Sequence, residues 1–241
     1  MLALQEALRG AKRGKALDVG TRLGEFAFRL AEAMPEGSEV IGIDKDPAAG
    51  EKAREAFSKK GLQFRVMDGA AMEFPDETFE AVALSNTLHH IENYEAVLGE
   101  MLRVLKPGGY FILNEMYRDN QNAAQQVHAA QHTLEARLDC LLGDYQRETW
   151  TRAEIVEIFR KLPLEEASFT DFREEAVYDA KLEAKNRKLA DEVEKISGRP
   201  EYDALKKEAL DIQERCRRDG IQRCTQLLCV GRKRTVQLAG F

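Results

Sequence analysis

Residues 15–24, Lys-Ala-Leu-Asp-Val-Gly-Thr-Arg-Leu-Gly, lead from a short apolar run into an amphipathic stretch at Phe26–Met34. Such a run is typical of a buried strand, and the stretch after it has the period of a helix. Glycines at this junction let backbone N–H groups and the helix N-terminus approach a ligand closely. The junction alone is a weak signal, because a tight strand-to-helix turn also needs glycine for its own conformation.

The alternation of apolar runs with amphipathic stretches continues to Phe111, which predicts βαβ units and a parallel sheet. Seven strands are expected, at Ala16–Val19, Glu39–Ile43, Gln63–Met67, Ala81–Ser85, Tyr110–Asn114, Leu164–Phe172 and Thr225–Arg232. Helices are expected at Phe26–Met34, Ala48–Lys60, Tyr94–Leu105 and about Asn120–Leu142, with another that opens at Thr151. The fold class is therefore α/β.

The segment Arg173–Gly220, between the last two strands, is charged and helical in its period. Two narrow apolar seams run through it, one at Tyr178, Leu182, Leu189, Val193 and Ile196, the other at Tyr202, Leu205, Ala209, Ile212 and Cys216. Narrow seams of this kind pack helices on each other. We therefore expect a core domain of residues 1–172 and 221–241 with an inserted helical hairpin at 173–220, acting as a lid or as the arm of a homodimer.

The composition, with 44% hydrophobic and 32% charged residues, is that of a globular chain. The formal net charge of −6 gives no general attraction to nucleic acid or to an anionic membrane, and no apolar run approaches the length of a membrane span. The four cysteines, Cys140, Cys216, Cys224 and Cys229, show no Cys-x-x-Cys spacing. We expect a cytoplasmic protein with reduced, structural thiols.

Three neighbouring strands carry an acid near their carboxyl ends: Asp18, Asp44 and Asp68. Asp44 follows Gly24 by 44 − 24 = 20 residues, a spacing that places a carboxylate where it accepts hydrogen bonds from ribose hydroxyls. Because the carboxyl ends of parallel strands meet at one edge of the sheet, all three acids are expected there. The three acids together therefore favour a ligand-binding role for the glycine turn over a purely structural one.

Residues 15–116 resemble the class I S-adenosylmethionine-dependent methyltransferases that act on small molecules. The resemblance rests on five parts that occur in the family's order: Leu17–Gly24, Gly42–Asp44, Asp68–Ala70, Asp76–Val82 with Ser85–His90, and Leu102–Gly109. It implies a Rossmann-like, mostly parallel seven-stranded sheet with helices on both faces. It also implies S-adenosyl-L-methionine as cofactor and S-adenosyl-L-homocysteine as product.

The resemblance carries roles over to individual residues. Gly20 and Gly24 would lie against the methionine part of the cofactor, Asp44 would bind ribose, Asp68 the adenine amino group, and Asn86 would flank the sulfonium. The full set assigned to the cofactor is Asp18, Gly20, Thr21, Arg22, Gly24, Asp44, Lys45, Asp68, Gly69 and Asn86. Arg22 departs from the family, which usually has a glycine there. Its side chain must turn away from the cofactor, pair with the cofactor's carboxylate, or block the pocket.

The histidines fall in two places: His89 and His90 follow the fourth strand, and His128 and His132 lie on the long helix. His128, His132, Glu135 and Asp139 form one stripe of that helix, within about 60° of one another. A solvated polar face is the commoner role of such a stripe. The alternative is a wall of the substrate cavity, with His128 or His132 as base or as part of a metal site.

The residues assigned to the acceptor side are His90, Glu115, His128 and His132. The function expected is methyl transfer to a small molecule by in-line displacement, with metal dependence left open. Two alternatives remain: a non-catalytic S-adenosylmethionine-binding sensor or scaffold, which Arg22 motivates, and a nicotinamide-dependent oxidoreductase, which shares the glycine turn and Asp44. The segments Asp68–Ala70 and Leu88–His90 argue against the oxidoreductase.

Overall fold

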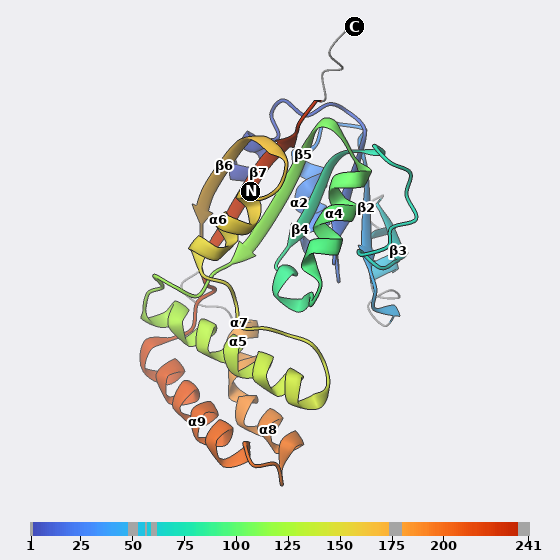
Figure 1. Cartoon of the computed structure of the whole chain (residues 1–241). Coiled ribbons are helices and arrows are strands. Elements are labelled where there is room, and N and C mark those ends of the chain that lie inside the picture. The colour runs from blue at the N-terminus through green and yellow to red at the C-terminus, as the bar shows by residue number, and fades with distance from the viewer. Residues whose placement is uncertain (1, 48–52, 56, 59–61, 174–179, 236–241) are drawn as a thin grey trace, which may run out of the picture.

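The computed structural model describes residues 2–47, 53–55, 57–58, 62–173 and 180–235. Its centre is a seven-stranded sheet of order β3-β2-β1-β4-β5-β7-β6 (Figure 1). The strands are β1 (Lys15–Val19), β2 (Glu39–Asp44), β3 (Gln63–Val66), β4 (Phe79–Ser85), β5 (Leu105–Met116), β6 (Leu164–Phe172) and β7 (Gln226–Lys233). Neighbours among β1 to β5 pair in parallel, and β7 runs antiparallel between β5 and β6. The predicted mostly parallel seven-stranded sheet is confirmed.

Helices cover both faces of the sheet, as predicted. On one face, α4 (Tyr94–Val104) and α6 (Arg152–Arg160) share an apolar core with the strands. On the other, α1 (Leu2–Ala7) and α2 (Glu25–Ala33) share a second core. Strand β1 alternates between them, because its successive side chains point to opposite faces: Leu17 and Val19 lie in the first core and Ala16 in the second. The helix predicted at Ala48–Lys60 falls partly outside the described residues.

A separate helical layer lies over the carboxyl ends of the strands (Figure 1). It contains α5 (Ala123–Leu142), α7 (Ala180–Arg187), α8 (Leu189–Val193), η2 (Glu194–Ile196) and α9 (Tyr202–Asp219), and we call it the cap. Residues from both predicted seams, including Val193 and Ile212, share one apolar core with Val127 and Leu134 of α5. Tyr178, assigned to the first seam, lies outside the described residues. The insertion thus packs on α5 as well as on itself.

The first arm of the insertion is a broken helix, where one continuous helix was expected. Helix α7 ends at Arg187 and α8 begins at Leu189. The Gln213 side-chain amide donates to the backbone carbonyls of Asn186 and Arg187, at 3.0 and 2.9 Å. These carbonyls are therefore satisfied from α9 rather than by the next helical turn, which allows the interruption. None of the helices in the described residues has both the length and the apolarity that crossing a bilayer needs.

Candidate functional site

The loop from Gly20 to Gly24 turns β1 into α2 through three left-handed residues. Gly20, Arg22 and Gly24 have φ of 67°, 44° and 88°. A Cβ on Gly20 would lie 2.3 Å from Thr87 Cγ2, so this position requires glycine for packing as well as for backbone. Arg22 therefore has a left-handed backbone conformation that glycine adopts more readily than a residue with a side chain.

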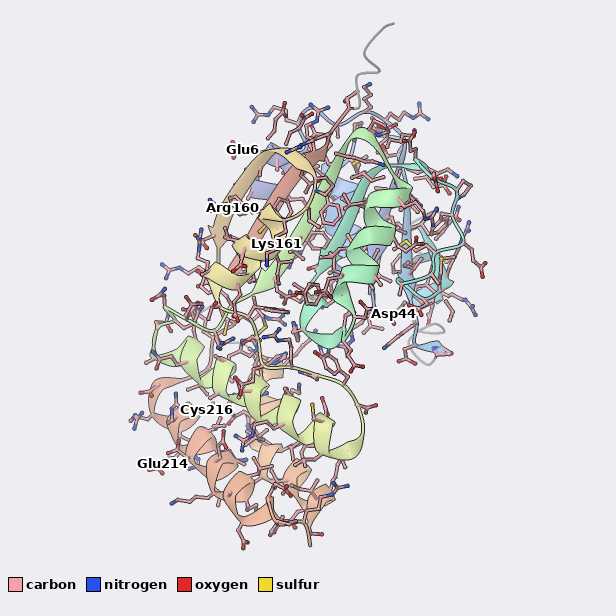
Figure 2. The ribbon with its side chains drawn as sticks, in the orientation of Figure 1. Glu6, Asp44, Arg160, Lys161, Glu214 and Cys216 are labelled. Atoms are coloured by element: carbon pink, nitrogen blue, oxygen red, sulfur yellow. The ribbon has the colours of Figure 1, made fainter. Side chains whose placement is uncertain are left out.

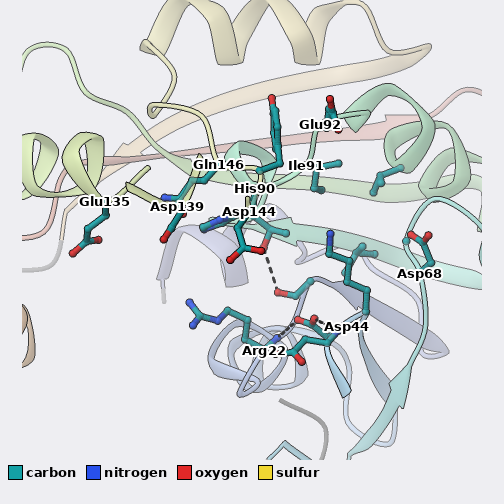
Figure 3. A pocket seen from close by; sticks show the side chains of 18 of the residues that line it. Arg22, Asp44, Asp68, His90, Ile91, Glu92, Glu135, Asp139, Asp144 and Gln146 are labelled. Atoms are coloured by element: carbon teal, nitrogen blue, oxygen red, sulfur yellow. Dashed lines mark hydrogen bonds between the residues drawn. The ribbon is translucent and has the colours of Figure 1, made fainter. Parts of the chain in front are cut away.

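Asp44, at the end of β2, ties this loop to the neighbouring strand. It is 8% exposed. Its Oδ2 accepts from the Arg22 backbone N–H at 2.9 Å, and its Oδ1 accepts from the Asp46 N–H at 3.0 Å. Figure 3 shows the Arg22 side chain extending away from Asp44. A carboxylate has about four lone-pair positions, so Asp44 keeps acceptor capacity for hydroxyls of a ligand.

Asp18 and Thr21 support the loop from within the protein. Asp18 Oδ2 accepts from the Thr21 hydroxyl at 2.6 Å, and among the described residues Asp18 Oδ1 has no hydrogen-bond partner. Burial raises the pKa of Asp18 to about 7, and its hydrogen bond with Thr21 offsets only part of that effect. Neither residue lines the cavity described next, so their part in a cofactor site is indirect.

A cavity of about 1130 Å³ lies between the loop edge of the sheet and the cap. Ligand pockets commonly measure about 300–1,000 Å³, so this volume is large enough for small-molecule ligands. Figure 2 shows Asp44 at the sheet edge that faces the cap. Eight of the residues assigned from sequence line the cavity: Gly20, Arg22, Asp44, Lys45, Asp68, Gly69, His90 and His132.

Two further cofactor assignments fall outside the cavity wall. Gly24 caps α2, and a Cβ there would lie 2.2 Å from the Phe57 ring, so its role is packing. Asn86, with φ of 46°, turns its side chain to the strands: its Oδ1 accepts from Met116 N–H at 3.0 Å, and its Nδ2 donates to Gln226. The structure therefore gives Asn86 a role in joining the ends of β4, β5 and β7.

Glu115 and His128, both assigned to the acceptor side, do not line the cavity either. Glu115 is fully buried; one oxygen accepts from Leu88 N–H at 3.0 Å and the other lies 2.8 Å from His89 Nδ1. His128 Nδ1 accepts from the backbone N–H of Cys224 at 3.0 Å. Glu115 therefore holds His89 and the start of η1 in place, and His128 joins α5 to the segment that leads into β7.

The stripe on α5 divides between two environments. His132, Glu135 and Asp139 line the cavity, whereas His128 does not. Three of the four stripe residues thus lie on the cavity wall, because the cap places α5 over the edge of the sheet. Figure 3 shows Glu135 and Asp139 on this wall, with Asp144 and Gln146 nearby.

Several cavity residues were not assigned from the sequence. Some, such as Met67 and Ile91, lie on the sheet side. The others come from the cap and from the loop after α5: Leu138, Leu142, Asp144, Tyr145, Gln146, Lys185, Lys188, Glu192 and Lys195. Among them, Lys185 Nζ donates to Glu135 at 2.6 Å. No local motif marks these positions, since they reach the cavity only after the insertion has packed on α5.

Histidines from two elements meet at the junction of sheet and cap. The His89 ring centroid lies 4.2 Å from that of His90, on the short turn η1 (Leu88–His90), and 4.7 Å from that of His132 on α5. Burial lowers the pKa of His90 to about 3, and it lowers that of His132 well below 6.5. Both imidazoles are therefore neutral at pH 7, available as hydrogen-bonding groups or metal ligands.

Comparisons with known proteins agree with this geometry. Residues 17–113 match the family model described as "Methyltransferase domain". A demethylmenaquinone methyltransferase from Thermus thermophilus is 37% identical over 116 residues, which is 47% of this chain and 50% of the relative. The chain thus matches about half the length of the curated relatives.

Solved structures share the fold over nearly the whole chain. The YcgJ protein from Bacillus subtilis has a TM-score of 0.58 at 16% identity, covering 97% of this chain and 99% of the other. The cyclase SpnF has a TM-score of 0.63 at 18% identity, covering 97% of this chain and 80% of the other. One of these is named as a cyclase, so the shared fold does not by itself fix an activity.

Proposed function

We propose that this chain, whose residues 17–113 form a domain of the matched methyltransferase family, transfers a methyl group from S-adenosyl-L-methionine to a small molecule. One observation carries the proposal. The left-handed loop at Gly20–Arg22 and the buried Asp44 carboxylate form one rim of a cavity whose opposite wall holds histidines and acids. Such a cavity has separate places for a donor and an acceptor.

The residues on the sheet side fit this cofactor. Asp44 has acceptor capacity for ribose hydroxyls, and Asp68 and Gly69 lie beside it on the cavity wall. Backbone groups of the Gly20–Arg22 loop line the neighbouring part. When bound, the cofactor supplies an electrophilic methyl group on a sulfonium. Arg22 presents a guanidinium in the same cavity, suited to a carboxylate.

The residues on the acceptor side align a nucleophile and keep water out. Methyl transfer is an in-line displacement, so positioning and desolvation provide most of the acceleration, and a base is required only for a protonated nucleophile. His90 and His132 are neutral and offer hydrogen bonds to an acceptor. Helices α5, α7 and α8 close this half of the cavity.

For the acceptor, we propose a small organic molecule. The relative from Thermus thermophilus is named for demethylmenaquinone, which makes quinone precursors the first acceptors to test. The family match ends at residue 113, before α5 begins at Ala123, so the cap that lines the acceptor half lies beyond it. Acceptor choice is therefore expected to depend on residues outside the matched part of the chain.

We further propose that the insertion acts as a lid. Both of its seams are used in the core that it shares with α5, and Lys185, Lys188, Glu192 and Lys195 line the cavity. A dimer arm would instead need a free apolar face. We also propose a cytoplasmic location, where the four cysteines would stay reduced.

The experiment is titration calorimetry with S-adenosyl-L-methionine, followed by methyl-transfer assays against quinone precursors. Asp44→Asn should weaken donor binding by roughly 10- to 100-fold, because hydrogen bonds to a charged group contribute about 1.5–3 kcal/mol. Glu39→Ala is the matched control: it removes a carboxylate at the opposite end of β2 and should leave the affinity unchanged.

Equal affinities in wild type and Asp44→Asn would refute the ribose assignment. Tight donor binding without transfer to any acceptor would instead favour the sensor or scaffold. Binding of NAD in place of S-adenosyl-L-methionine would identify an oxidoreductase.

A further inference from the structure

Three histidines converge where η1 meets α5. His89, His90 and His132 each offer a ring nitrogen, and these three atoms lie within 4.8 Å of one another. His90 and His132 line the cavity, whereas His89 lies behind them and is 1% exposed. Two elements far apart in sequence thus direct imidazoles to one point. This arrangement is the donor set that divalent transition metals favour.

The environment of His89 is that of a metal ligand with an outer-sphere partner. Glu115 Oε1 lies 2.8 Å from His89 Nδ1, and because a carboxylate only accepts, Nδ1 carries the hydrogen. The lone pair is then on Nε2, a buried atom with no hydrogen-bond partner among the described residues. Metal-binding histidines commonly donate their second ring N–H to a carboxylate, which fixes the tautomer and makes the free nitrogen more basic.

The imidazoles of His90 and His132 are also available to bind a cation. His90 and His132 both line the cavity, so their rings can be reached from the side on which a metal ion would enter. The Gln146 side-chain amide lies 3.4 Å from His132 Nδ1. The amide can donate its N–H to this nitrogen or accept a hydrogen from it with its oxygen, so it is compatible with either tautomer of His132.

We propose that His89, His90 and His132 form a binding site for a divalent first-row transition metal, of which Zn²⁺ is the type ion. Three imidazoles around Zn²⁺ at about 2.0–2.1 Å lie roughly 3.3 Å apart, so the rings must close in slightly on binding. Three protein ligands leave a fourth position, and His90 and His132 place it on the cavity side. An acceptor oxygen there would be polarised by the metal. That last role rests on the proposed methyl transfer, whereas metal binding does not.

The test is a titration of the metal-free full chain with Co²⁺, followed by visible absorption, with Zn²⁺ as competitor. Wild type should take up one ion per chain, show the intense bands of low-coordinate Co²⁺, lose them when Zn²⁺ is added, and melt at a higher temperature with metal. His132→Asn should weaken Co²⁺ binding by about 100-fold or more, because even loss of an outer-sphere partner costs about 10- to 100-fold.

The matched control is His128→Asn, one turn earlier on α5 and outside the cluster. Asparagine keeps an acceptor for the Cys224 N–H, and Co²⁺ affinity should stay within about threefold of wild type. His90→Asn provides a second ligand variant if His132→Asn does not fold. Failure of wild type to bind either metal, or equal binding by wild type and both ligand variants, would overturn the proposal. Donor calorimetry on the same samples tests the proposed function separately.

Discussion

Asp18 is a carboxylic acid placed where water does not reach it. It lies near the end of β1, 1% exposed, and its surroundings raise its pKa from 3.8 to about 7. A group whose pKa is higher in the folded state than in the unfolded state makes its full contribution to stability at pH values below the unfolded-state pKa. This contribution is lost as the pH rises towards the folded-state pKa. Asp18 should therefore make the protein progressively less stable from pH 3.8 to about 7.

Asp18→Asn should remove that pH dependence. The free energy of unfolding of the variant, relative to wild type, should rise between about pH 5 and about pH 8, because only wild type must ionise a buried carboxyl. Urea unfolding at both pH values measures this difference. Asp68→Asn, which replaces an exposed acid two residues after the end of β3, is the control and should follow wild type. Parallel pH profiles for wild type and Asp18→Asn would contradict the assigned pKa.

For individual residues, the sequence predicted the place in the fold better than the direction of the side chain. Asp44 and His132 could be assigned because strand ends and a helical stripe follow from spacing alone. Asn86 could not, because a left-handed φ of 46° turns its side chain towards β5 and β7. Glu115 lies away from the cavity wall for a similar reason: its partner is His89 on η1, a contact that arises only once β4 and β5 are paired.

Among the elements, the turn between β1 and α2 depends on glycine for its packing. A Cβ on Gly24 would lie 2.2 Å from Phe57, a ring that is 1% exposed and packs against Phe28 and Phe64 at 5.4 and 5.8 Å. The ring therefore has little freedom to move aside. Gly99, inside α4, is the opposite case, since a Cβ there would meet nothing within 4 Å.

Gly24→Ala and Gly99→Ala should consequently change stability in opposite directions. Gly24→Ala combines a left-handed backbone with overpacking and should cost about 2 kcal/mol or more. Gly99→Ala should stabilise by about 0.5–1 kcal/mol, because alanine has the higher helix propensity and no clash. Urea unfolding of both variants at one pH measures the pair. A neutral Gly24→Ala would show that the loop can relax.

The elements were largely predictable because their signals are local. Thr151 accepts from Glu154 N–H, and the Glu154 side chain accepts from Thr151 N–H, as the capping-box pattern indicates. The early start of β5 was missed, because the Pro-Gly-Gly sequence at 107–109 also fits a turn. The break in the first insertion arm was missed because its cause, Gln213, lies on another helix.

For the molecule as a whole, the decisive feature is that the cap has its own core. The apolar cluster of α5, α8 and α9 shares no member with the two clusters that flank the sheet. Polar links occur where the two layers meet: the Arg147 N–H, in the loop after α5, donates to the His89 carbonyl of η1 at 3.0 Å, and His128 of α5 accepts from the Cys224 N–H just before β7. Layers joined in this way can open separately, which is what a lid over a cavity requires.

Ile212→Ala should therefore loosen the cap and spare the sheet. Ile212 is 1% exposed within the cap core, and its truncation should cost about 2–5 kcal/mol. Hydrogen exchange followed by mass spectrometry should show faster exchange in α5 and α9 and little change in β1 and β4. Ile158→Ala, a truncation in the sheet core, should give the reverse pattern. Because the proposed donor-binding rim belongs to the sheet, Ile212→Ala should keep donor affinity while losing transfer to the acceptor. Uniformly faster exchange in both layers would mean that cap and sheet open as one unit, and the lid proposal would fail.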